Sequence, residues 1–296
     1  MNQYFTFLNQ FKQFCYKKKH SNYLVIPVTL GVEFLTSLYH DGKSFTTINS
    51  ARSALSYYVQ LIDEVHLDFG KHPLVVLFMR GIFKLRPALP RYKTTWDVKP
   101  VLDRLKDIDN KVSSLKDLSM KCATLIALTS GQRVQTLAAF TINNILSIED
   151  KIILNIDKVL KTTRPGFHTT VELCSFPEDS RICPVQCLST YIERTADIRN
   201  GNSLFVAVLK PHRAVCSQTI SRWISTCLRI SGIDISFCAH STRSAAVSRA
   251  KHKAIDMTTI LKTAGWANSK SFAKYYDKTI STGSSSPTKF VKAILS

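Results

Sequence analysis

The sequence contains no long hydrophobic run. None of its 296 residues lies in a stretch approaching the roughly 18 to 20 uninterrupted apolar residues that span a bilayer. The first twenty residues mix aromatic with polar side chains and lack the apolar centre of a signal peptide. These absences exclude a helical membrane protein and show no sign of secretion. We therefore expect a cytoplasmic protein, or a nuclear one if the host is a eukaryote, with no membrane partner.

Cysteines at metal-binding spacing are also missing. The eight cysteines include no CxxC pair, and the closest two, Cys183 and Cys187, have no histidine or second pair at the spacing of a zinc site. Isolated cysteines in apolar segments are usually small buried hydrophobes. The sequence therefore predicts reduced, structural thiols and no metal ion.

Acidic residues are scarce relative to basic ones. Forty Lys and Arg stand against 21 Asp and Glu, which gives a formal net charge of +19 and a pI near 9.7. Such an excess repels itself unless a polyanion neutralises it, so nucleic acid is the natural partner. Acidic proteins and membrane surfaces are the alternatives. The basic residues are spread through the chain rather than gathered in one tail, which favours a folded DNA-binding surface.

Hydrophobic periodicity indicates helices over residues 1 to about 85. Apolar residues recur at three- and four-residue spacing, interrupted by the turn signal His40-Asp41-Gly42. Pro73 stands at the start of the last, short and buried helix of this region. The segment 85–102 then carries three prolines among basic residues, and helices stop at such places. We predict a helical domain over 1–88 and a basic linker over 89–98.

The periodicity changes in the second half of the chain. Two strand-like runs flank Arg164-Pro165-Gly166, which predicts a β-hairpin, and an apolar helix is expected after Arg133. Other helices are expected at 100–108, 114–129, 185–195, 218–231, 242–252, 256–264 and 269–278. The fold is therefore predicted to be mainly α with a small antiparallel β-hairpin or sheet. A second domain covers 99–280, and 281–296 forms a flexible joint and tail.

Several segments carry residues suited to phosphate chemistry. "SGQRVQTL" (130–137) contains Arg133, "LKTTRPG" (160–166) presents Lys161 in the hairpin, and "HSTR" (240–243) spaces His240 and Arg243 three apart. Residues three apart share one face of a helix. "GWANSKSFAKYY" (265–276) ends on two adjacent tyrosines.

In this order, the segments resemble the tyrosine recombinase (phage integrase) family. The resemblance covers roughly residues 95 to 280, and the helical N-terminal region is similar to the family's core-binding domain. "LKTTRPG", "KPH" (210–212), "HSTR" and "GWANSKSFAKYY" are most similar to eukaryotic members borne by mobile elements. The resemblance implies a DNA strand-exchange enzyme that forms a 3′-phosphotyrosyl intermediate. It further implies four protomers acting on paired double-stranded sites.

The two arginines and the histidine suit the charge that develops on the phosphate. Arg133 and Arg243 would clamp phosphoryl oxygens through planar, permanently charged forks. His240 would hydrogen-bond the same phosphate or accept the tyrosine's proton. An arginine paired with an acid and a packed core histidine are the structural alternatives. Many bacterial relatives have an acid three residues after the first arginine, where this chain has Thr136.

Two further site residues follow from the resemblance. Lys161 matches the hairpin lysine expected to protonate the departing 5′ oxygen, with Lys158 as its nearest competitor. Trp266 would donate its indole N–H to the phosphate, although core packing is an alternative. No cofactor is implied, because the phosphotyrosine bond stores the energy of the broken one.

The tyrosine pair leaves the nucleophile open between two residues. Tyr275 lies nine residues past Trp266, the spacing of many bacterial members, and Tyr276 lies ten past it, the spacing of the eukaryotic ones. Adjacent helical residues point about 100° apart, so only one can face the phosphate. We choose Tyr276 as nucleophile and Tyr275 as an aromatic packing residue.

Further basic residues are predicted to contact DNA. They lie in the proline-rich segment and in or near the family motifs: Arg86, Arg91, Lys93, Arg164, Lys210 and Arg249. Two alternatives to strand exchange are a non-catalytic DNA-binding protein derived from a recombinase and a type IB topoisomerase. Salt-sensitive DNA binding is common to all of them.

Overall fold

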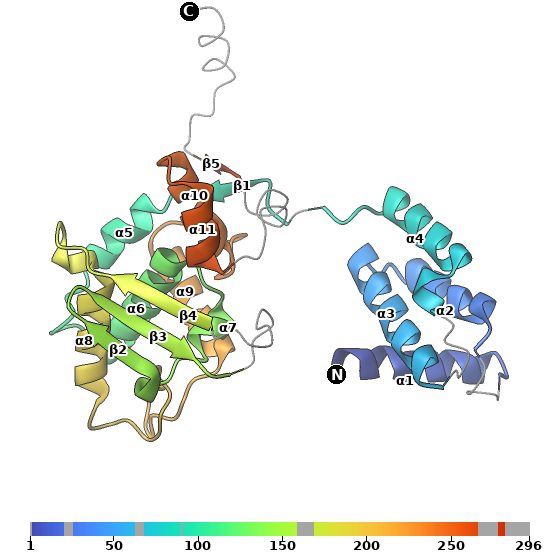
Figure 1. Cartoon of the computed structure of the whole chain (residues 1–296), viewed down its shortest axis with the longest axis horizontal. Coiled ribbons are helices and arrows are strands. Elements are labelled where there is room, and N and C mark those ends of the chain that lie inside the picture. The colour runs from blue at the N-terminus through green and yellow to red at the C-terminus, as the bar shows by residue number, and fades with distance from the viewer. Residues whose placement is uncertain are drawn as a thin grey trace, which may run out of the picture. The chain divides into compact units, whose positions relative to one another are not determined.

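The chain forms two compact units, Met1–Arg91 and Tyr92–Ser296 (Figure 1). The computed structural model describes residues 2–20, 26–62, 68–89, 91–158, 169–265 and 278–281. Across these ranges, no helix has both the length and the apolar character needed to cross a bilayer.

The first unit is helical, as its periodicity predicted. Its elements are α1 (Asn2–Lys17), α2 (Val28–His40), α3 (Phe45–Ile62), the 3₁₀ helix η1 (Phe69–Lys71) and α4 (Pro73–Leu85). Phe11 and Phe34 meet edge to face in its core, with ring centroids 5.2 Å apart. Gly31 permits α2 to approach Phe69, because a Cβ there would lie 2.4 Å from that ring's Cε2 atom.

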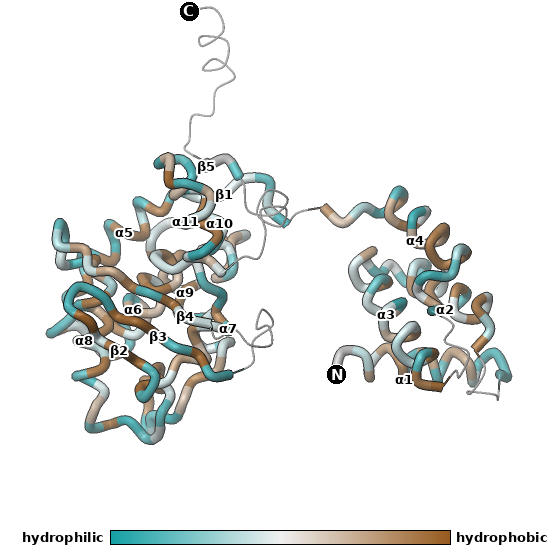
Figure 2. The backbone as a smooth tube through the Cα atoms, in the orientation of Figure 1, coloured by the Kyte–Doolittle hydropathy of each residue, from teal (hydrophilic) through white to brown (hydrophobic). Residues whose placement is uncertain are grey.

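The last helix of this unit differs from its prediction. Pro73 does occupy the first turn of α4, and the helix is hydrophobic along much of its length (Figure 2). Only one stripe of it is buried, formed by Val75, Met79 and Ile82, whereas Leu77 is 68% exposed. The prediction of a buried helix is therefore only partly right, because high hydropathy does not specify which faces find partners.

The second unit is built of helices with a small sheet packed on one side of them (Figure 1). Its elements before the sheet are β1 (Thr94–Trp96), α5 (Lys99–Lys106), α6 (Leu115–Ser130), α7 (Val134–Leu137) and the 3₁₀ helix η2 (Ile142–Asn144). The sheet strands are β2 (Ile145–Ile148), β3 (Lys151–Ile156) and β4 (Thr169–Cys174). After it come the 3₁₀ helix η3 (Ser180–Ile182), α8 (Pro184–Thr195), α9 (Ser217–Ile230), α10 (Ser241–His252), α11 (Met257–Ala264) and β5 (Thr279–Ser281).

α6 is the central helix of the second unit. Twelve of its sixteen residues are buried, and α8 and α9 pack against it. Ser114 begins the helix by accepting a hydrogen bond from the Asp117 amide at 3.1 Å. Gly131 ends it in the left-handed region at φ +60°. Because α6 is held on nearly all sides, its C-terminal end and the residues that follow have a fixed place in the unit.

The sheet contains one strand more than the sequence predicted. β2, β3 and β4 pair antiparallel in that order, and Ile152, Leu154 and Ile156 alternate into the core. The apolar helix predicted after Arg133 is a single turn, α7, after which the chain turns into η2 and β2. The helix is shorter than predicted because of contacts with residues distant in sequence. Bonds to a distant segment, Ile142 N–H to Asn202 O at 2.8 Å among them, compete with continued helix.

Most of the segment assigned to the linker packs into the second unit. Trp96 and Val98 are 4% and 6% exposed. β1 pairs in parallel with β5, and the sequence predicted neither strand. The composition of residues 89–98 predicts a basic linker, either solvated or lying along phosphates. The buried indole instead fixes residues 92–98 to the unit that follows.

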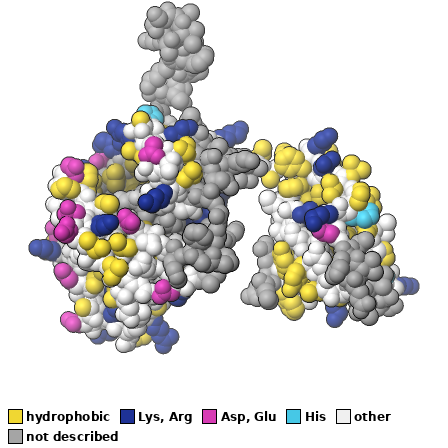
Figure 3. Space-filling view, viewed as in Figure 1, with side chains coloured by type: hydrophobic (Ala, Val, Ile, Leu, Met, Phe, Trp, Pro, Cys, Tyr) yellow, Lys and Arg dark blue, Asp and Glu magenta, His cyan; other side chains and the backbone are white. Residues whose placement is uncertain are grey.

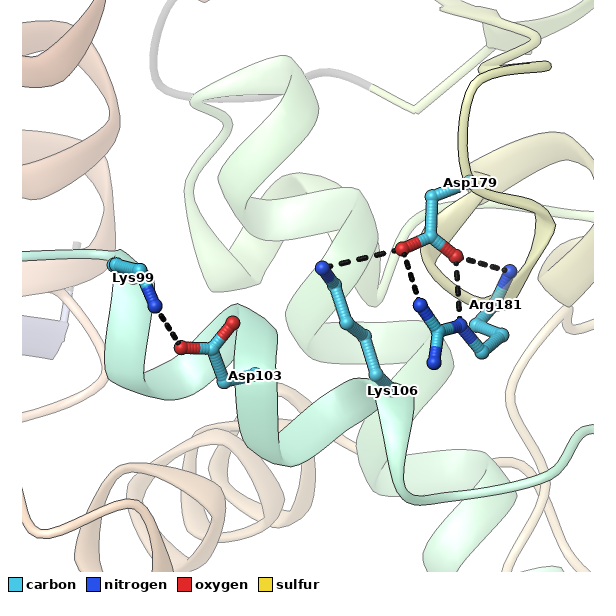
Figure 4. A network of polar contacts seen from close by, with 5 residues as sticks. All are labelled: Lys99, Asp103, Lys106, Asp179 and Arg181. Carbon is cyan, nitrogen blue, oxygen red and sulfur yellow. Dashed lines mark hydrogen bonds and ion pairs between the residues drawn. The ribbon is translucent and has the colours of Figure 1, made fainter.

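A polar network joins α5 to η3 (Figure 4). Asp179 accepts hydrogen bonds from Arg181 Nε at 2.9 Å and pairs with Lys106 Nζ at 3.1 Å. The Arg181 guanidinium, with Lys106 assisting, holds the pKa of the Asp179 carboxyl well below its usual range. On α5 itself, Lys99 pairs with Asp103 at 2.5 Å. The carboxylate of Asp179 thus links two segments that are distant in sequence.

All eight cysteines are free thiols, and five are buried. Cys183 and Cys187 are both completely covered at the start of α8. Cys174 and Cys216 are exposed, so the prediction of buried hydrophobic thiols holds for most of the set but not for these two.

The buried phenol of Tyr191 should make the stability of the second unit depend on pH in the alkaline range. Its hydroxyl accepts a hydrogen bond from Val206 N at 3.1 Å, and burial raises the pKa of Tyr191 to about 12. An unfolded tyrosine ionises near pH 10, so the neutral phenol's contribution is complete below pH 10 and is lost as pH rises through about 12. We expect Tyr191→Phe to destabilise the protein by about 1–3 kcal/mol at neutral pH.

The pH dependence of this difference is the diagnostic result. Urea unfolding from pH 8 to 12 should show the free energy of unfolding of the wild type falling by about 2 kcal/mol relative to that of Tyr191→Phe. A difference that stays constant with pH would contradict the buried, neutral phenol.

Candidate active site

Arg243 lies where three helix ends meet. It is carried by the first turn of α10, and its Nη1 donates to Gly131 O at 2.5 Å and to Ala264 O at 2.7 Å. These carbonyls stand at the C-terminal ends of α6 and α11, where the helix dipoles favour a cation. The side chain of Arg243 is 0% exposed. The guanidinium therefore joins two helices to α10 at one point.

Arg133 is held close to this point by the residues before it. Gln132 donates from Nε2 to Thr263 O at 2.9 Å, which ties the turn after α6 to the end of α11. Arg133 follows in extended conformation at the N-cap position of α7, where its carbonyl accepts from Thr136 N at 2.8 Å. Its side chain is half-buried. The structure thus places Arg133 two residues from the carbonyl that Arg243 binds.

His240 stands at the N-cap position of the same helix that carries Arg243. Its side chain is exposed, unlike that of Arg243. The residues between them are buried, and Thr242 Oγ1 donates to Ala239 O at 2.7 Å. His240 is therefore not a buried core residue.

Gly131 permits the close meeting of α6, α10 and α11. A Cβ at this residue would lie 3.3 Å from Ala264 Cβ and 3.7 Å from Val247 Cγ1, in addition to the positive φ. We expect Gly131→Ala to lower the free energy of unfolding by about 2–3 kcal/mol, because left-handed strain and overpacking both contribute. Urea denaturation would measure this loss.

Gly232 provides the matched control for that substitution. It has φ +77° in the same unit, and a Cβ there would have no atom within 4 Å. Gly232→Ala should therefore cost about 1–2 kcal/mol, from strain alone. Equal losses for the two variants would contradict the close contact at Gly131.

Five of the predicted site residues lie outside the described residues: Lys161, Arg164, Trp266, Tyr275 and Tyr276. The structure does describe the residues on either side of these two segments. β3 and β4 pair up to Ile156 and Thr169, on either side of the segment with Lys161, and Lys158 is exposed. Gly265 ends α11 in the left-handed region, and Lys278 precedes β5.

The predicted DNA-contacting residues are not equivalent. Arg86 donates from Nη1 to Lys43 O at 2.5 Å and to Tyr39 O at 3.3 Å, so it ties the end of α4 to the turn after α2. Arg249 pairs with Asp97 at 3.0 Å. Both have internal structural partners that the sequence did not reveal.

Three other predicted DNA-contacting residues lie at the surface of the described part of the chain. Arg91, Lys93 and Lys210 are exposed, and the Lys210–Pro211 peptide bond is cis. Figure 3 shows Lys and Arg side chains interspersed with Asp and Glu over the visible face of the second unit. The basic side chains on this face are dispersed rather than gathered into one patch.

Sequence reasoning missed the residues that support this site. Trp96 donates from its indole to Ser241 Oγ at 2.8 Å, between His240 and Arg243 in the chain. The aromatic residues of "RYKTTWDV" were the available signal, since large aromatic side chains are uncommon in a solvated linker.

Comparisons with known proteins show the family and the fold of the chain. Residues 99–281 match the phage integrase family. A XerH site-specific recombinase bound to a palindromic difH substrate has a similar structure, with a TM-score of 0.67 and 17% identity over 99% of this chain and 78% of that chain. No curated protein sequence matches this chain.

Two other structures share the fold. A lambda integrase tetramer bound to a Holliday junction gives a TM-score of 0.58 and 15% identity over 93% of this chain and 70% of that chain. The Tn1549 transposon integrase with transposon right end DNA gives 0.59 and 13% over 93% and 86%. The architecture is thus that of tyrosine recombinases, and the match over residues 99–281 shows that the chain belongs to the phage integrase family.

Proposed function

We propose that this protein is a tyrosine recombinase that cuts and rejoins double-stranded DNA through a 3′-phosphotyrosyl intermediate. The observation that best supports this proposal is that the ends of α6 and α11 and the start of α10 meet at Arg243. Its bonds to Gly131 O and Ala264 O bring together segments that are more than a hundred residues apart in sequence, and Arg133 and His240 lie beside those segments. Family membership supports the same reaction.

The residues would divide the chemistry between them. Arg133 and Arg243 would stabilise charge on the phosphoryl oxygens, and His240 would bind the phosphate or accept the tyrosine's proton. Lys161 would protonate the leaving 5′ oxygen, and Trp266 would donate to the phosphate. Because the Arg243 side chain is fully covered, its contact with a phosphate requires the atoms that cover it to move when DNA binds.

The nucleophile would be Tyr276, and its attack on phosphorus would expel the 5′ oxygen, which takes a proton. The reverse attack by a 5′ hydroxyl would restore a phosphodiester and release the tyrosine. Bond energy is kept throughout, so no cofactor is needed.

The biological setting extends this proposal. We assign the protein to a mobile element, on the resemblance of its motifs to those of eukaryotic element-borne members, and hence to the nucleus of such a host. A homotetramer on paired sites is the proposed assembly. In support, the similar lambda integrase structure is a tetramer bound to a Holliday junction. The helical first unit would serve as a core-binding domain, and the tail "KFVKAILS" (289–296) would contact a neighbouring protomer.

Covalent capture tests the function. Nicked suicide substrates carrying candidate element ends would be incubated with the protein and resolved on a denaturing gel. We expect a protein–DNA adduct, and peptide mapping by mass spectrometry should place the nucleotide on a tyrosine. The same duplexes without a nick serve as the control, because religation should then keep the adduct scarce.

The alternatives give different results. Tight, salt-sensitive DNA binding without an adduct over a broad set of substrates would favour a non-catalytic DNA-binding protein. An adduct accompanied by relaxation of supercoiled plasmid, but no joining to a second duplex, would favour a type IB topoisomerase.

A further inference from the structure

A buried tryptophan fixes the beginning of α10. Trp96 is 4% exposed, and its Nε1 donates to Ser241 Oγ at 2.8 Å. Ser241 in turn donates to Cys238 O at 2.7 Å, so its hydroxyl joins the indole to the turn before the helix. Ser241 is the residue directly after His240 and two before Arg243. The bond therefore acts on the chain between the two candidate catalytic residues of α10.

Contacts on either side of Trp96 hold the same region. The Tyr92 hydroxyl donates to Ser236 O at 3.1 Å, in the loop that leads into α10. Asp97 pairs with Arg249 on the second half of the helix at 3.0 Å. Residues 92–97 thus touch the approach, the first turn and the later part of α10, and we call this segment the strap.

The strap also holds the strand that follows the two tyrosines. β1 lies within it and pairs in parallel with β5, with Thr95 opposite Ile280. Lys278 Nζ lies 5.1 Å from the centroid of the Tyr92 ring, and burial lowers the pKa of Lys278. β5 begins three residues after Tyr276 in the sequence. One short segment therefore contacts both elements that adjoin the proposed chemistry.

We propose that Trp96 is a positioning residue for DNA cleavage: through Ser241 it sets the place of His240 and Arg243, while the strap around it anchors the strand after the nucleophile. This inference rests on the proposed function. A tryptophan is suited to the role because its rigid ring is locked by packing and its single N–H donor points in one direction. Displacement of catalytic groups by about 1 Å can cost a hundredfold in rate, so a positioning defect should appear in the chemical step.

Trp96→Phe and Ser241→Ala test the bond from its two sides. Trp96→Phe removes this bond alone, and Ser241→Ala removes it together with the bond from Ser241 to Cys238 O. Both substitutions leave most of the packing. We expect each variant to form adduct about 10- to 100-fold more slowly at saturating DNA, with DNA affinity within about twofold of the wild type. The double variant should be no slower than Ser241→Ala, because that substitution already removes the bond to Trp96. Trp223→Phe is the matched control, a tryptophan in the same core that is 8% exposed, and should keep its rate.

A structural readout separates this inference from the proposed function. In Trp96→Phe, hydrogen exchange should lose protection selectively at the first turn of α10 and at β5, whether or not the protein cleaves DNA. If the wild type forms no adduct, the proposed function fails and this exchange pattern decides the strap's role. Unchanged or uniformly reduced protection would overturn the inference. So would a cleavage defect no larger than that of Trp223→Phe, or additive effects of the two substitutions.

Discussion

Tyr276→Phe is expected to abolish the covalent protein–DNA adduct completely. The substitution removes only the hydroxyl and keeps the aromatic ring, so no phosphate ester can form. Binding of the same DNA should stay within about twofold, because a single neutral hydroxyl contributes little beside the phosphate contacts of many basic residues. Suicide-substrate gels and a filter-binding titration at fixed salt would measure the two quantities.

Tyr275→Phe is the matched control because it makes the same change one residue earlier. We expect it to keep the adduct, since adjacent helical residues point about 100° apart and only one tyrosine can face the phosphate. Loss of the adduct in Tyr275→Phe but not in Tyr276→Phe would reassign the nucleophile to the residue nine past Trp266. An adduct that survives in both variants would contradict a tyrosine nucleophile in this segment.

Arg243→Lys is expected to slow adduct formation by about 10²- to 10³-fold and also to destabilise the protein. Lysine keeps the charge but is a compact point donor, so it cannot replace a fork that binds two carbonyls and is proposed to bind a phosphate. Buried carbonyls left without a donor cost about 1–3 kcal/mol each. Single-turnover rates at a temperature well below unfolding, together with urea denaturation, would separate the two effects.

Arg199 provides the control for the structural part of that change. It is a half-buried arginine in the same unit that also donates to main-chain carbonyls, including Leu204 O at 2.6 Å. Arg199→Lys should lower stability and leave the rate of adduct formation nearly unchanged. If both variants slow cleavage equally, the effect of Arg243 would be structural and its proposed contact with phosphate would be wrong.

Local patterns in the sequence predicted most of the helices correctly. α6, α8, α9, α10 and α11 all begin and end within about two residues of their predicted bounds. Their apolar spacing and their end signals, such as Ser114 and Gly131, act over a single turn of chain. Such signals are legible without knowledge of the fold, because the interactions that they reflect are themselves local.

The elements that were missed depend on partners distant in sequence. α7 stops after one turn, and β2 was not anticipated, because the chain there bonds to residues near 202–204. Trp96 falls within the predicted linker, and its burial has no local signal because its partner Ser241 lies 145 residues away. Composition identifies a proline-rich, basic segment, but it does not indicate that a single indole will be buried against a helix from the other end of the unit.

The sequence by itself determined the charge, the helical character, the order of the motif residues and the family that they resemble. Only the tertiary structure decided that Arg243 is covered and bound to two helix C-termini, that Arg86 serves carbonyls within the first unit, and that residues 92–98 belong to the second unit. The physical reason is the range of the interactions. Residue type and spacing specify which chemistry is available and which face a residue occupies, whereas burial and hydrogen-bond partners arise when distant segments pack together.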